Sequence, residues 1–386
     1  MKKSVGLFLS SEPNYGGVYQ YSLSIIKALE NLDPVKYKLT CFILDEKWVA
    51  ILPDRFEKVL IRNKYIDRVF GAVARRLLRS ASGWRFSGSF SESARVINAS
   101  DCDVVIYPGQ DSTAYHASKK SIVAIHDLMH RYESHFEEYQ GRECVNRDLH
   151  YSAICKYADL ILVDSQIGRQ QVLESYRVLD NKVHILSFVP PYYLLDSSVA
   201  DVKNKFMLPD RFIFYPAQFW EHKNHINLLK ALKILKDKGD EVNLVLVGSK
   251  KNNFSKVIAK IEEYGLSKNV FILGYVTNDD MYSLYKSAVA MTFVSLIGPT
   301  NIPPMEALIT GCPLICSNAY AMPEQVGNAG LLVNPKDPTD IADKIQLIWN
   351  DTNISQKLIT LGHQQISKYG QADFTRMLCE HIDKFL

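Results

Sequence analysis

The segment 295–308 combines a loop with the start of a helix, an arrangement that could hold a phosphate group. An apolar strand pattern runs into a glycine-containing loop, and a helical pattern then begins with Pro303 in its first turn, where the missing N–H costs little. The positive end of the helix dipole favours anions at such a place. We therefore expect an anion pocket, suited to a pyrophosphate, formed by the backbone N–H groups of Thr300, Asn301 and Ile302.

Glu306 falls about one turn into the same helix. A carboxylate there could accept hydrogen bonds from a diol such as a ribose. The alternative is an ordinary strand–loop–helix connection in which Glu306 only complements the helix dipole.

A second strand end, in the segment 215–225, carries Lys223 just before another helical pattern. Lys223 would place a positive charge where the helix N-terminus faces a phosphate, and Asn224 can cap that helix. The alternative is a solvated surface lysine.

Gly16 and Gly17 follow the first apolar strand pattern and begin a helix. Glycines at this position let the backbone approach a ligand closely, although a tight turn would explain them equally well. The sequence contains no GxGxxG at this turn, so a dinucleotide fingerprint is absent.

His126 lies at the tip of a strand, in a run that ends at His130 and resembles the zinc motif HExxH with Asp in place of Glu. That motif needs both histidines on one helix face, whereas the first histidine here closes a β-branched strand. We expect His126 to contact substrate in a cleft. A structural histidine and a metal ligand are the alternatives.

Short β-branched runs alternate with helical patterns along the chain, which predicts parallel sheets with helices on both faces. The strand candidates are 5–9, 38–44, 104–107, 122–125, 160–163 and 183–186, then 212–215, 242–247, 270–273, 289–294, 314–316 and 331–333. Between these two sets the alternation pauses at a Pro-rich and polar stretch, 190–201, and no short-period repeat occurs. The sequence therefore predicts two doubly wound domains, whose ligands lie outside the carboxyl ends of the strands.

Composition narrows the class of protein. The chain of 386 residues is 47% hydrophobic and 23% charged, as in globular proteins, and its net charge of +3 is too small to indicate nucleic-acid binding. Its 7 cysteines form no CxxC pair; Cys312 and Cys316 flank an apolar strand and are expected to be buried thiols in a reducing compartment. We expect no secretory signal and no membrane span, hence a cytoplasmic protein.

Taken together, these segments resemble the GT-B glycosyltransferases, and within them the retaining family four (glycosyltransferases group 1), in the form found among bacterial polysaccharide and O-antigen enzymes. Gly16-Gly17 resembles the family's N-terminal glycine loop, and His126-Asp127 and Asp164-Ser165 resemble two strand ends. The second half resembles the family in 218–224 (the phosphate clamp), Gly274-Tyr275-Val276 (beside the nucleobase), 298–306 (the E-x7-E motif) and the downstream tail 323–335.

The resemblance implies two Rossmann-like domains facing across a cleft. These would be an acceptor domain over 1–195, a nucleotide-sugar domain over 205–370, and a C-terminal helix over 371–386 that packs back toward the first domain. It also implies catalytic roles for His126, Lys223 and Glu306, and donor contacts from Gly16, Gly17, Gln218, Val276, Gly298, Thr300, Asn301 and Ile302.

Two positions depart from the family pattern. Gly298 replaces the first glutamate of E-x7-E, which normally contacts the donor sugar, and Gln218 replaces the clamp arginine. Lys223 is then the evident cation, and Thr300 and Asn301 could contact sugar hydroxyls instead. These departures bear on the identity of the sugar more than on catalysis.

The resemblance implies transfer of a sugar with retention of configuration, without cofactor or metal, from a nucleotide sugar to a lipid-linked or growing polysaccharide acceptor. Guanosine-diphosphomannose is the favoured donor. An NDP-sugar epimerase of the same architecture and a non-catalytic nucleotide-sugar-binding subunit are the alternatives.

A basic stretch, 62–85, suggests contact with the inner face of the cytoplasmic membrane. If it is helical, its apolar residues line one face and its arginines the opposite one, which suits an anionic membrane surface. The alternative is a helix that packs on its own sheet. The arginines concerned are Arg68, Arg75, Arg76 and Arg79.

Overall fold

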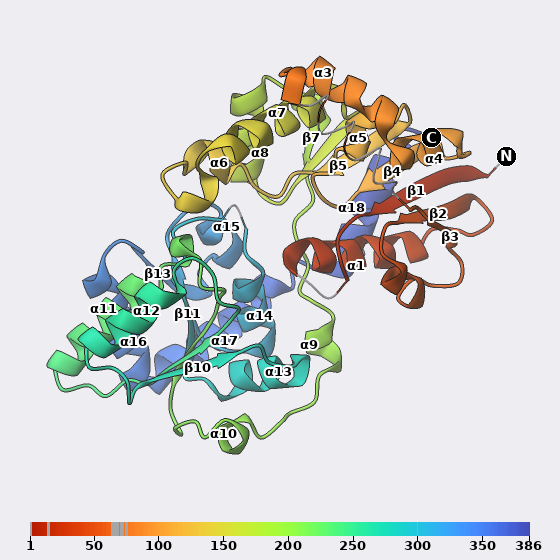
Figure 1. Cartoon of the computed structure of the whole chain (residues 1–386). Coiled ribbons are helices and arrows are strands. Elements are labelled where there is room, and N and C mark those ends of the chain that lie inside the picture. Colours follow the sequence, from red (N-terminus) through yellow and green to blue (C-terminus); the bar gives the residue numbers. More distant parts are fainter. Residues whose placement is uncertain (1, 14–15, 63–68, 70–72, 74–75, 299) are drawn as a thin grey trace. The chain divides into compact units, whose positions relative to one another are not determined.

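The computed structural model describes residues 2–13, 16–62, 69, 73, 76–298 and 300–386 (Figure 1). The chain forms two compact units. Unit 1 comprises Met1–Val189 and Gln371–Leu386, and unit 2 comprises Pro190–Gly370. The sequence-based boundary differs here, because 190–195 belong to unit 2, where helix α9 (Tyr193–Asp196) packs against two of its helices.

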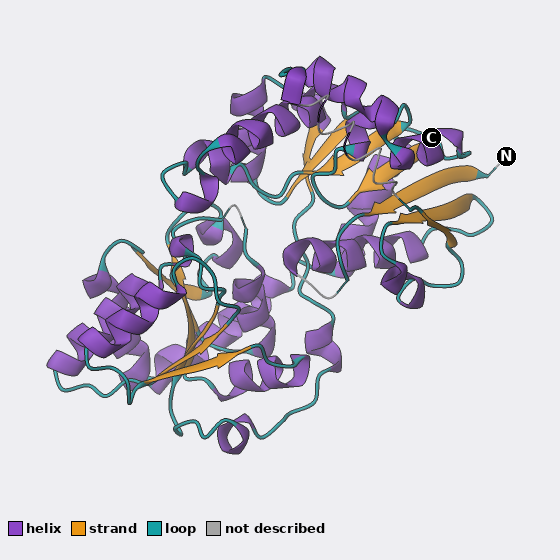
Figure 2. Ribbon diagram, viewed as in Figure 1, coloured by secondary structure: helices purple, strands orange, loops and turns teal. Residues whose placement is uncertain are grey.

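Unit 1 contains a parallel sheet of seven strands in the order β3-β2-β1-β4-β5-β6-β7 (Figure 2). The strands are β1 (Lys3–Leu9), β2 (Tyr37–Ile43), β3 (Glu57–Leu60), β4 (Val104–Tyr107), β5 (Lys120–Ala124), β6 (Leu160–Val163) and β7 (Val183–Ile185). The six strands predicted from the first half are confirmed. Strand β3 was missed because this short edge strand lacks the buried apolar run that marks the central strands.

The helices of unit 1 cover this sheet. Those that the structure describes are α1 (Gly16–Glu30), α3 (Ala81–Phe86), α4 (Glu92–Ala99), α5 (Thr113–His116), α6 (Met129–Tyr132), α7 (Arg142–Tyr157), α8 (Gln166–Tyr176) and α18 (Gln371–Asp383), with 3-10 turns η1 (Glu46–Ala50), η2 (Ser87–Phe90), η3 (Glu137–Tyr139) and η4 (Asp180–Lys182). The C-terminal helix α18 packs against α1, where the rings of Tyr21 and Phe374 lie 5.7 Å apart.

Unit 2 contains a second parallel sheet, of six strands in the order β10-β9-β8-β11-β12-β13. The strands are β8 (Ile213–Pro216), β9 (Leu244–Val247), β10 (Val270–Gly274), β11 (Ala290–Phe293), β12 (Leu314–Ser317) and β13 (Gly330–Val333), so all six predicted strands are confirmed. The central strands β8, β9, β11 and β12 are buried along their whole length, as expected of a sheet covered on both faces.

The remaining helices of unit 2 are α10 (Val202–Lys205), α11 (His225–Asp237), α12 (Phe254–Glu263), α13 (Asn278–Ser287), α14 (Ile302–Thr310), α15 (Met322–Val326), α16 (Pro338–Asn350) and α17 (Thr352–Ile366), with the 3-10 turn η5 (Glu221–Lys223). Capping residues in the sequence determine where several of these helices begin. Thr277 and Asp280 form a capping box for α13, and Asp337 and Asp351 cap α16 and α17.

Each sheet has one point where its strand order reverses. The neighbours there are β1 and β4 in unit 1, and β8 and β11 in unit 2. Loops leave such a pair in opposite directions and open a crevice at the carboxyl edge, where ligands bind in open α/β sheets. The predicted segments 16–17, 215–225 and 295–308 all follow strands of these two pairs.

Two further expectations concern cysteines and membrane spans. Cys312 and Cys316 are buried, as predicted, and the free thiols of the chain also include Cys41, Cys102, Cys144, Cys155 and Cys379. Within the described ranges, no helix combines the length and the apolar character needed to cross a bilayer.

Candidate active site

The loops that follow β8 and β11 are tied together by hydrogen bonds. The N–H of Leu296 donates to the carbonyl oxygen of His222 at 2.8 Å, and the Ser295 hydroxyl donates to the Ile297 carbonyl oxygen at 2.8 Å. From the next strand, β12, the Ser317 hydroxyl donates to the Ser295 carbonyl at 2.7 Å. Since Ser295 and Ser317 are fully buried, these bonds fix the path of the loop that leads to α14.

Lys223 and Asn301 contact each other at the carboxyl edge of this sheet. The two predicted phosphate-binding segments, 215–225 and 295–308, are therefore neighbours. Lys223 Nζ donates to Asn301 Oδ1 at 3.1 Å and lies 5.2 Å from the centre of the Phe293 ring. Asn301 is the N-cap residue of α14, and prolines occupy the first turn of that helix as predicted. The ammonium group is therefore held beside a helix N-terminus, where an anion would bind.

Gln325 closes part of the predicted anion pocket. The N–H of Asn301 donates to Gln325 Oε1 at 3.2 Å, and Gln325 Nε2 donates to the Asn301 carbonyl oxygen at 2.6 Å. The prediction that the Asn301 N–H is open to an anion is therefore wrong, while the expected roles of Thr300 and Ile302 stay predictions. Gln325 was missed because its only signal is its place two residues after Pro323 in the downstream tail.

Gly298 and Asn301 depend on each other sterically. Gly298 has φ +136°, and a Cβ atom at this position would stand 2.3 Å from Asn301 Nδ2. Any side chain here would therefore displace the Asn301 amide and with it the partner of Lys223. Asn301 Nδ2 is buried and has no hydrogen-bond partner among the described residues, so it is placed to donate to a ligand.

Glu306 lies buried in the second turn of α14 between two tyrosines. The hydroxyl of Tyr193 donates to Glu306 Oε1 and that of Tyr285 donates to Oε2, each at 2.7 Å. Burial raises the pKa of Glu306, although the two tyrosine hydroxyls act to lower it. A carboxylate can accept about four hydrogen bonds, so both oxygens keep capacity for a diol. Sequence reasoning missed both tyrosines, which come from separate helices, α9 and α13.

Two polar residues of the segment 215–225 have partners within unit 2. The cap predicted for Asn224 is wrong, and the donor contact predicted for Gln218 stays a prediction. Asn224 makes no side-chain cap for α11; its backbone is left-handed, with φ 62°, and its amide donates to the carbonyls of Val294 (2.9 Å) and Pro335 (2.7 Å). Gln218 is exposed, and its oxygen accepts a hydrogen bond from Trp220 Nε1 at 2.9 Å. Asn224 thus links three loops of the crevice instead of capping one helix.

Val276 and Gly248 show how the neighbouring strand ends are built. The Val276 side chain belongs to the hydrophobic core of unit 2, whereas Tyr275 beside it is 84% exposed. The donor contact predicted for Val276 stays a prediction. Gly248, after β9, was missed by sequence reasoning. A Cβ atom there would stand 2.3 Å from the Ala217 carbonyl oxygen, so only glycine lets the two loops approach.

The reversal point of unit 1 carries the glycine pair. Gly16 begins α1 with φ +71°, a conformation that favours glycine. After the neighbouring strand β4, a Cβ atom at Gly109 would lie 3.1 Å from Val18 Cγ1. The start of α1 therefore packs close to the loop after β4, and the donor contacts predicted for Gly16 and Gly17 stay predictions.

His126, after β5, has both ring nitrogens engaged within unit 1. Nε2 donates to the Pro108 carbonyl at 2.7 Å, and Nδ1 lies 3.2 and 3.3 Å from the carboxylate oxygens of Asp164. Burial disfavours the charged ring, but the charge and hydrogen bond of Asp164 and the bond to Pro108 outweigh this and raise the pKa of His126. Since both partners are acceptors, the geometry favours a buried imidazolium, enclosed by the rings of Tyr21 and Phe188.

His130 does not join His126 in a metal-binding pair. It lies on α6, where its Nε2 faces the Tyr176 hydroxyl at 3.2 Å, and burial lowers its pKa to about 4. Over the part of the chain that the structure describes, no cluster of three or more His, Cys, Asp or Glu side chains is placed to hold a metal.

The predicted membrane-contact arginines fall partly outside the described residues, which do not include Arg68 and Arg75. Arg76 and Arg79 are exposed. Three apolar residues of the same stretch, Val69, Val73 and Leu77, are exposed by 42%, 49% and 75%.

Comparison with known proteins gives matches in sequence and in structure. Residues 198–365 match the family model described as Glycosyl transferases group 1. Serotype-specific mannosyltransferase WbdA of Escherichia coli is 26% identical over 277 residues, which make up 69% of this chain and 34% of that protein. O-antigen chain mannosyltransferase B of Escherichia coli is 25% identical over 250 residues, 62% of this chain and 64% of that protein. The chain thus spans about a third of the length of the first of these relatives.

Solved structures match over nearly the whole chain. Sucrose-phosphate synthase from Thermosynechococcus elongatus has a TM-score of 0.74 at 17% identity and covers 99% of both chains. The Anabaena protein HepE in complex with UDP and glucose has a TM-score of 0.75 at 15% identity, with coverage of 98% of this chain and 99% of that one. Together with the two parallel sheets, this likeness shows that the chain has the GT-B fold, and the family match supports a glycosyltransferase enzyme.

Proposed function

We propose that this chain transfers a hexosyl residue from a nucleotide sugar to a lipid-linked or growing polysaccharide acceptor, with retention of anomeric configuration and without a metal. The family match over 198–365 and the mannosyltransferase relatives support sugar transfer. The UDP and glucose bound to the HepE structure support a nucleotide-sugar donor.

The observation that carries this proposal is the contact of Lys223 with Asn301, 3.1 Å long, at the N-terminus of α14. It combines a cation, a helix dipole and an unpartnered amide donor where the order of the strands reverses. Such a combination matches a diphosphate that gains negative charge as its bond to a sugar breaks.

The proposed reaction breaks the glycosyl–phosphate bond while the acceptor hydroxyl attacks the same face of the sugar. The bonding electrons leave with the diphosphate, whose oxygen takes the proton of the attacking hydroxyl. Lys223, the N–H groups of Thr300 and Ile302 and the helix dipole would stabilise the departing charge. Asn301 Nδ2 would donate to the donor, in the space that a carboxylate-bearing residue at 298 would have occupied.

His126 has a different role in this proposal. As an imidazolium whose nitrogens both have acceptor partners, it has no lone pair to act as a base or nucleophile. We assign it a positioning role in which its backbone carbonyl faces the donor sugar.

Replacing Lys223 tests the proposal directly. Removal of one donor aimed at developing charge costs about 2.7–4 kcal/mol, so Lys223→Ala should lower kcat roughly a hundredfold or more. Lys230→Ala is the matched control, because Lys230 is exposed on the helix that follows Lys223. An unchanged kcat in Lys223→Ala would remove this residue from the site.

The stereochemistry and the competing functions need product analysis. NMR of the first product should show the anomeric configuration of the donor, and activity should survive EDTA. Release of an isomerised nucleotide sugar without acceptor would instead indicate an epimerase. Binding of a nucleotide sugar with neither transfer nor slow hydrolysis would indicate a non-catalytic subunit.

The donor can be identified by a thermal-shift screen of nucleoside diphosphates and their sugars. Guanosine-diphosphomannose is the first candidate, because the relatives are named mannosyltransferases. A ligand present at 100 times its Kd should add about 2.7 kcal/mol of stability. We further propose that the enzyme works in the cytoplasm, peripherally bound to the membrane that holds its acceptor.

A further inference from the structure

Gln325, on α15, is a buried polar side chain that the proposed reaction does not use; it is 3% exposed. Its amide forms a reciprocal pair of hydrogen bonds with the backbone of Asn301, accepting from the N–H at 3.2 Å and donating to the carbonyl oxygen at 2.6 Å. Reversing this amide would place donor against donor and acceptor against acceptor. The pair therefore fixes both the Gln325 amide and the Asn301 backbone.

The backbone of Gln325 is held in turn by α17. Gln365 Nε2 donates to the Gln325 carbonyl oxygen at 3.0 Å, and Lys368 Nζ donates to Gln365 Oε1 at 2.8 Å. Helix α14 packs against both α15 and α17. The N-terminus of α14 is therefore supported by two other helices, and Gln325 makes the polar contact between them.

The first turn of α14 offers few N–H groups to an anion. Pro303 and Pro304 have no N–H, and Gln325 occupies the N–H of Asn301. The Asn301 side chain makes no cap for the helix; its Oδ1 accepts from Lys223 Nζ instead. The positive charge at this helix end therefore depends strongly on where the Lys223 ammonium lies.

We propose that Gln325 is a positioning residue for sugar transfer. It fixes the backbone of Asn301, and Asn301 Oδ1 then fixes the Lys223 ammonium beside the leaving diphosphate. The inference rests on the proposed function, because it adds a residue to the same site. In this role Gln325 acts through Lys223, so its effect on the rate disappears when Lys223 is removed.

A double-mutant cycle tests this dependence with the wild type, Gln325→Met, Lys223→Ala and the double variant. Met has nearly the volume of Gln but cannot pair with both groups of the Asn301 backbone. Misplacing a catalytic group by about 1 Å can cost about a hundredfold, and we expect a smaller shift here, so Gln325→Met should lower kcat about tenfold. In the Lys223→Ala background the same change should lower kcat less than about twofold, because the two effects are coupled.

Binding of inorganic pyrophosphate, measured by calorimetry, repeats the cycle without a sugar or an acceptor. Gln325→Met should weaken pyrophosphate binding when Lys223 is present and change it by less than about twofold in the Lys223→Ala background. This measurement needs no sugar transfer, so the inference and the proposed function can fail separately.

Hydrogen exchange at Asn301 tests the order of the contacts. The Asn301 N–H should exchange faster in Gln325→Met, which lacks its acceptor, and at the wild-type rate in Lys223→Ala. Unchanged exchange in Gln325→Met would contradict the inference, because Gln325 would then not hold this part of the backbone.

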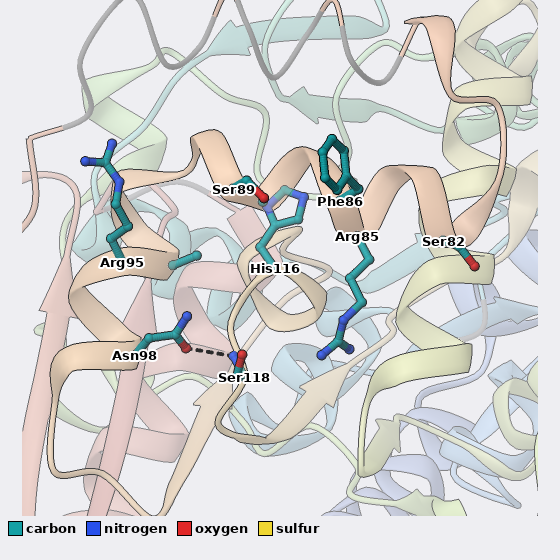
Figure 3. Close-up of a pocket in the computed structure, with 10 residues that line it drawn as sticks. Ser82, Arg85, Phe86, Ser89, Arg95, Asn98, His116 and Ser118 are labelled. Carbon is teal, nitrogen blue, oxygen red and sulfur yellow. Dashed lines mark hydrogen bonds between the residues drawn. The ribbon is translucent and has the colours of Figure 1, made fainter.

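Asn98 offers a matched control. It lines a pocket of about 480 Å³ in unit 1, and its Oδ1 accepts from the Ser118 N–H at 2.7 Å, the hydrogen bond drawn in Figure 3. This amide also holds a backbone N–H, but at the amino end of a sheet, because Ser118 precedes β5. Asn98→Met should therefore leave kcat and pyrophosphate binding unchanged. A cooperative thermal transition in every variant shows that all of them are folded.

The outcomes separate the two proposals. Losses from Gln325→Met and Lys223→Ala that multiply would overturn the inference and leave the proposed function intact, and so would an equal loss of kcat in Asn98→Met. Coupled effects on pyrophosphate binding in a wild type that transfers no sugar would contradict the proposed function and support the role of Gln325. A wild type that neither binds pyrophosphate nor transfers sugar would overturn both.

Discussion

The two units solve the problem of a buried ionisable side chain in different ways. In unit 1 the His126 imidazolium faces the Asp164 carboxylate at 3.2 Å, so opposite charges compensate each other. In unit 2 the Glu306 carboxylate accepts hydrogen bonds from two neutral tyrosine hydroxyls, and burial raises its pKa. The contact between His126 and Asp164 therefore depends on charge, whereas the contacts of Glu306 are hydrogen bonds that a neutral side chain could also make.

The largest effect on stability is expected from Asp164→Asn, which removes the countercharge of His126. Breaking a buried ion pair costs about 3–5 kcal/mol, because one charge is left uncompensated. Urea denaturation, with hydrogen exchange of β5 and β6 as the local measure, should show this loss. Asp159→Asn is the control, since Asp159 is exposed at the other end of β6 and accepts a hydrogen bond from the Ser121 N–H.

The pH dependence of that loss sharpens the comparison. Folding raises the pKa of His126 above its ordinary 6.5, so the folded state binds the His126 proton more tightly than the unfolded state does. The stability that the protonated ring contributes is therefore fully present below pH 6.5, and it is lost as the pH rises through the folded pKa. The difference in unfolding free energy between the wild type and Asp164→Asn should therefore narrow toward alkaline pH. If this difference in unfolding free energy does not change with pH, the His126 ring is neutral in the folded protein.

A smaller effect is expected from Glu306→Gln. The amide can accept from one tyrosine hydroxyl and donate to the other, so the loss should be about 1 kcal/mol or less. The same denaturation experiment, followed by hydrogen exchange of α14, measures it. A loss as large as that of Asp164→Asn would show that Glu306 also depends on its charge, and the contrast between the units would disappear.

A similarly small effect is expected from Tyr193→Phe, which removes one of two donors to Glu306. Loss of one net hydrogen bond costs about 1 kcal/mol. Since the Tyr193 hydroxyl acts to lower the pKa of Glu306, its removal should also raise that pKa, which titration of the unfolding free energy would detect. An unchanged pKa would mean that Tyr285 alone holds the carboxylate.

Much of the fold and part of the site could be predicted from the sequence. Buried parallel strands are continuous apolar runs, so all but the edge strand β3 were recognisable, and Lys223 and Asn301 could be found because each follows such a strand. Gln325, Tyr193 and Tyr285 could not, because their roles arise from contacts between helices far apart in the sequence. Asn224 was assigned wrongly because its residue type suits a helix cap, whereas its left-handed backbone directs the amide to Val294 and Pro335.

The return of the chain to unit 1 has a consequence for biosynthesis. Helix α18, whose Phe374 packs on Tyr21 of α1, is translated only after all of unit 2. Unit 1 therefore cannot complete its packing until α18 has been synthesised, although β1 is the first strand of the chain to be made.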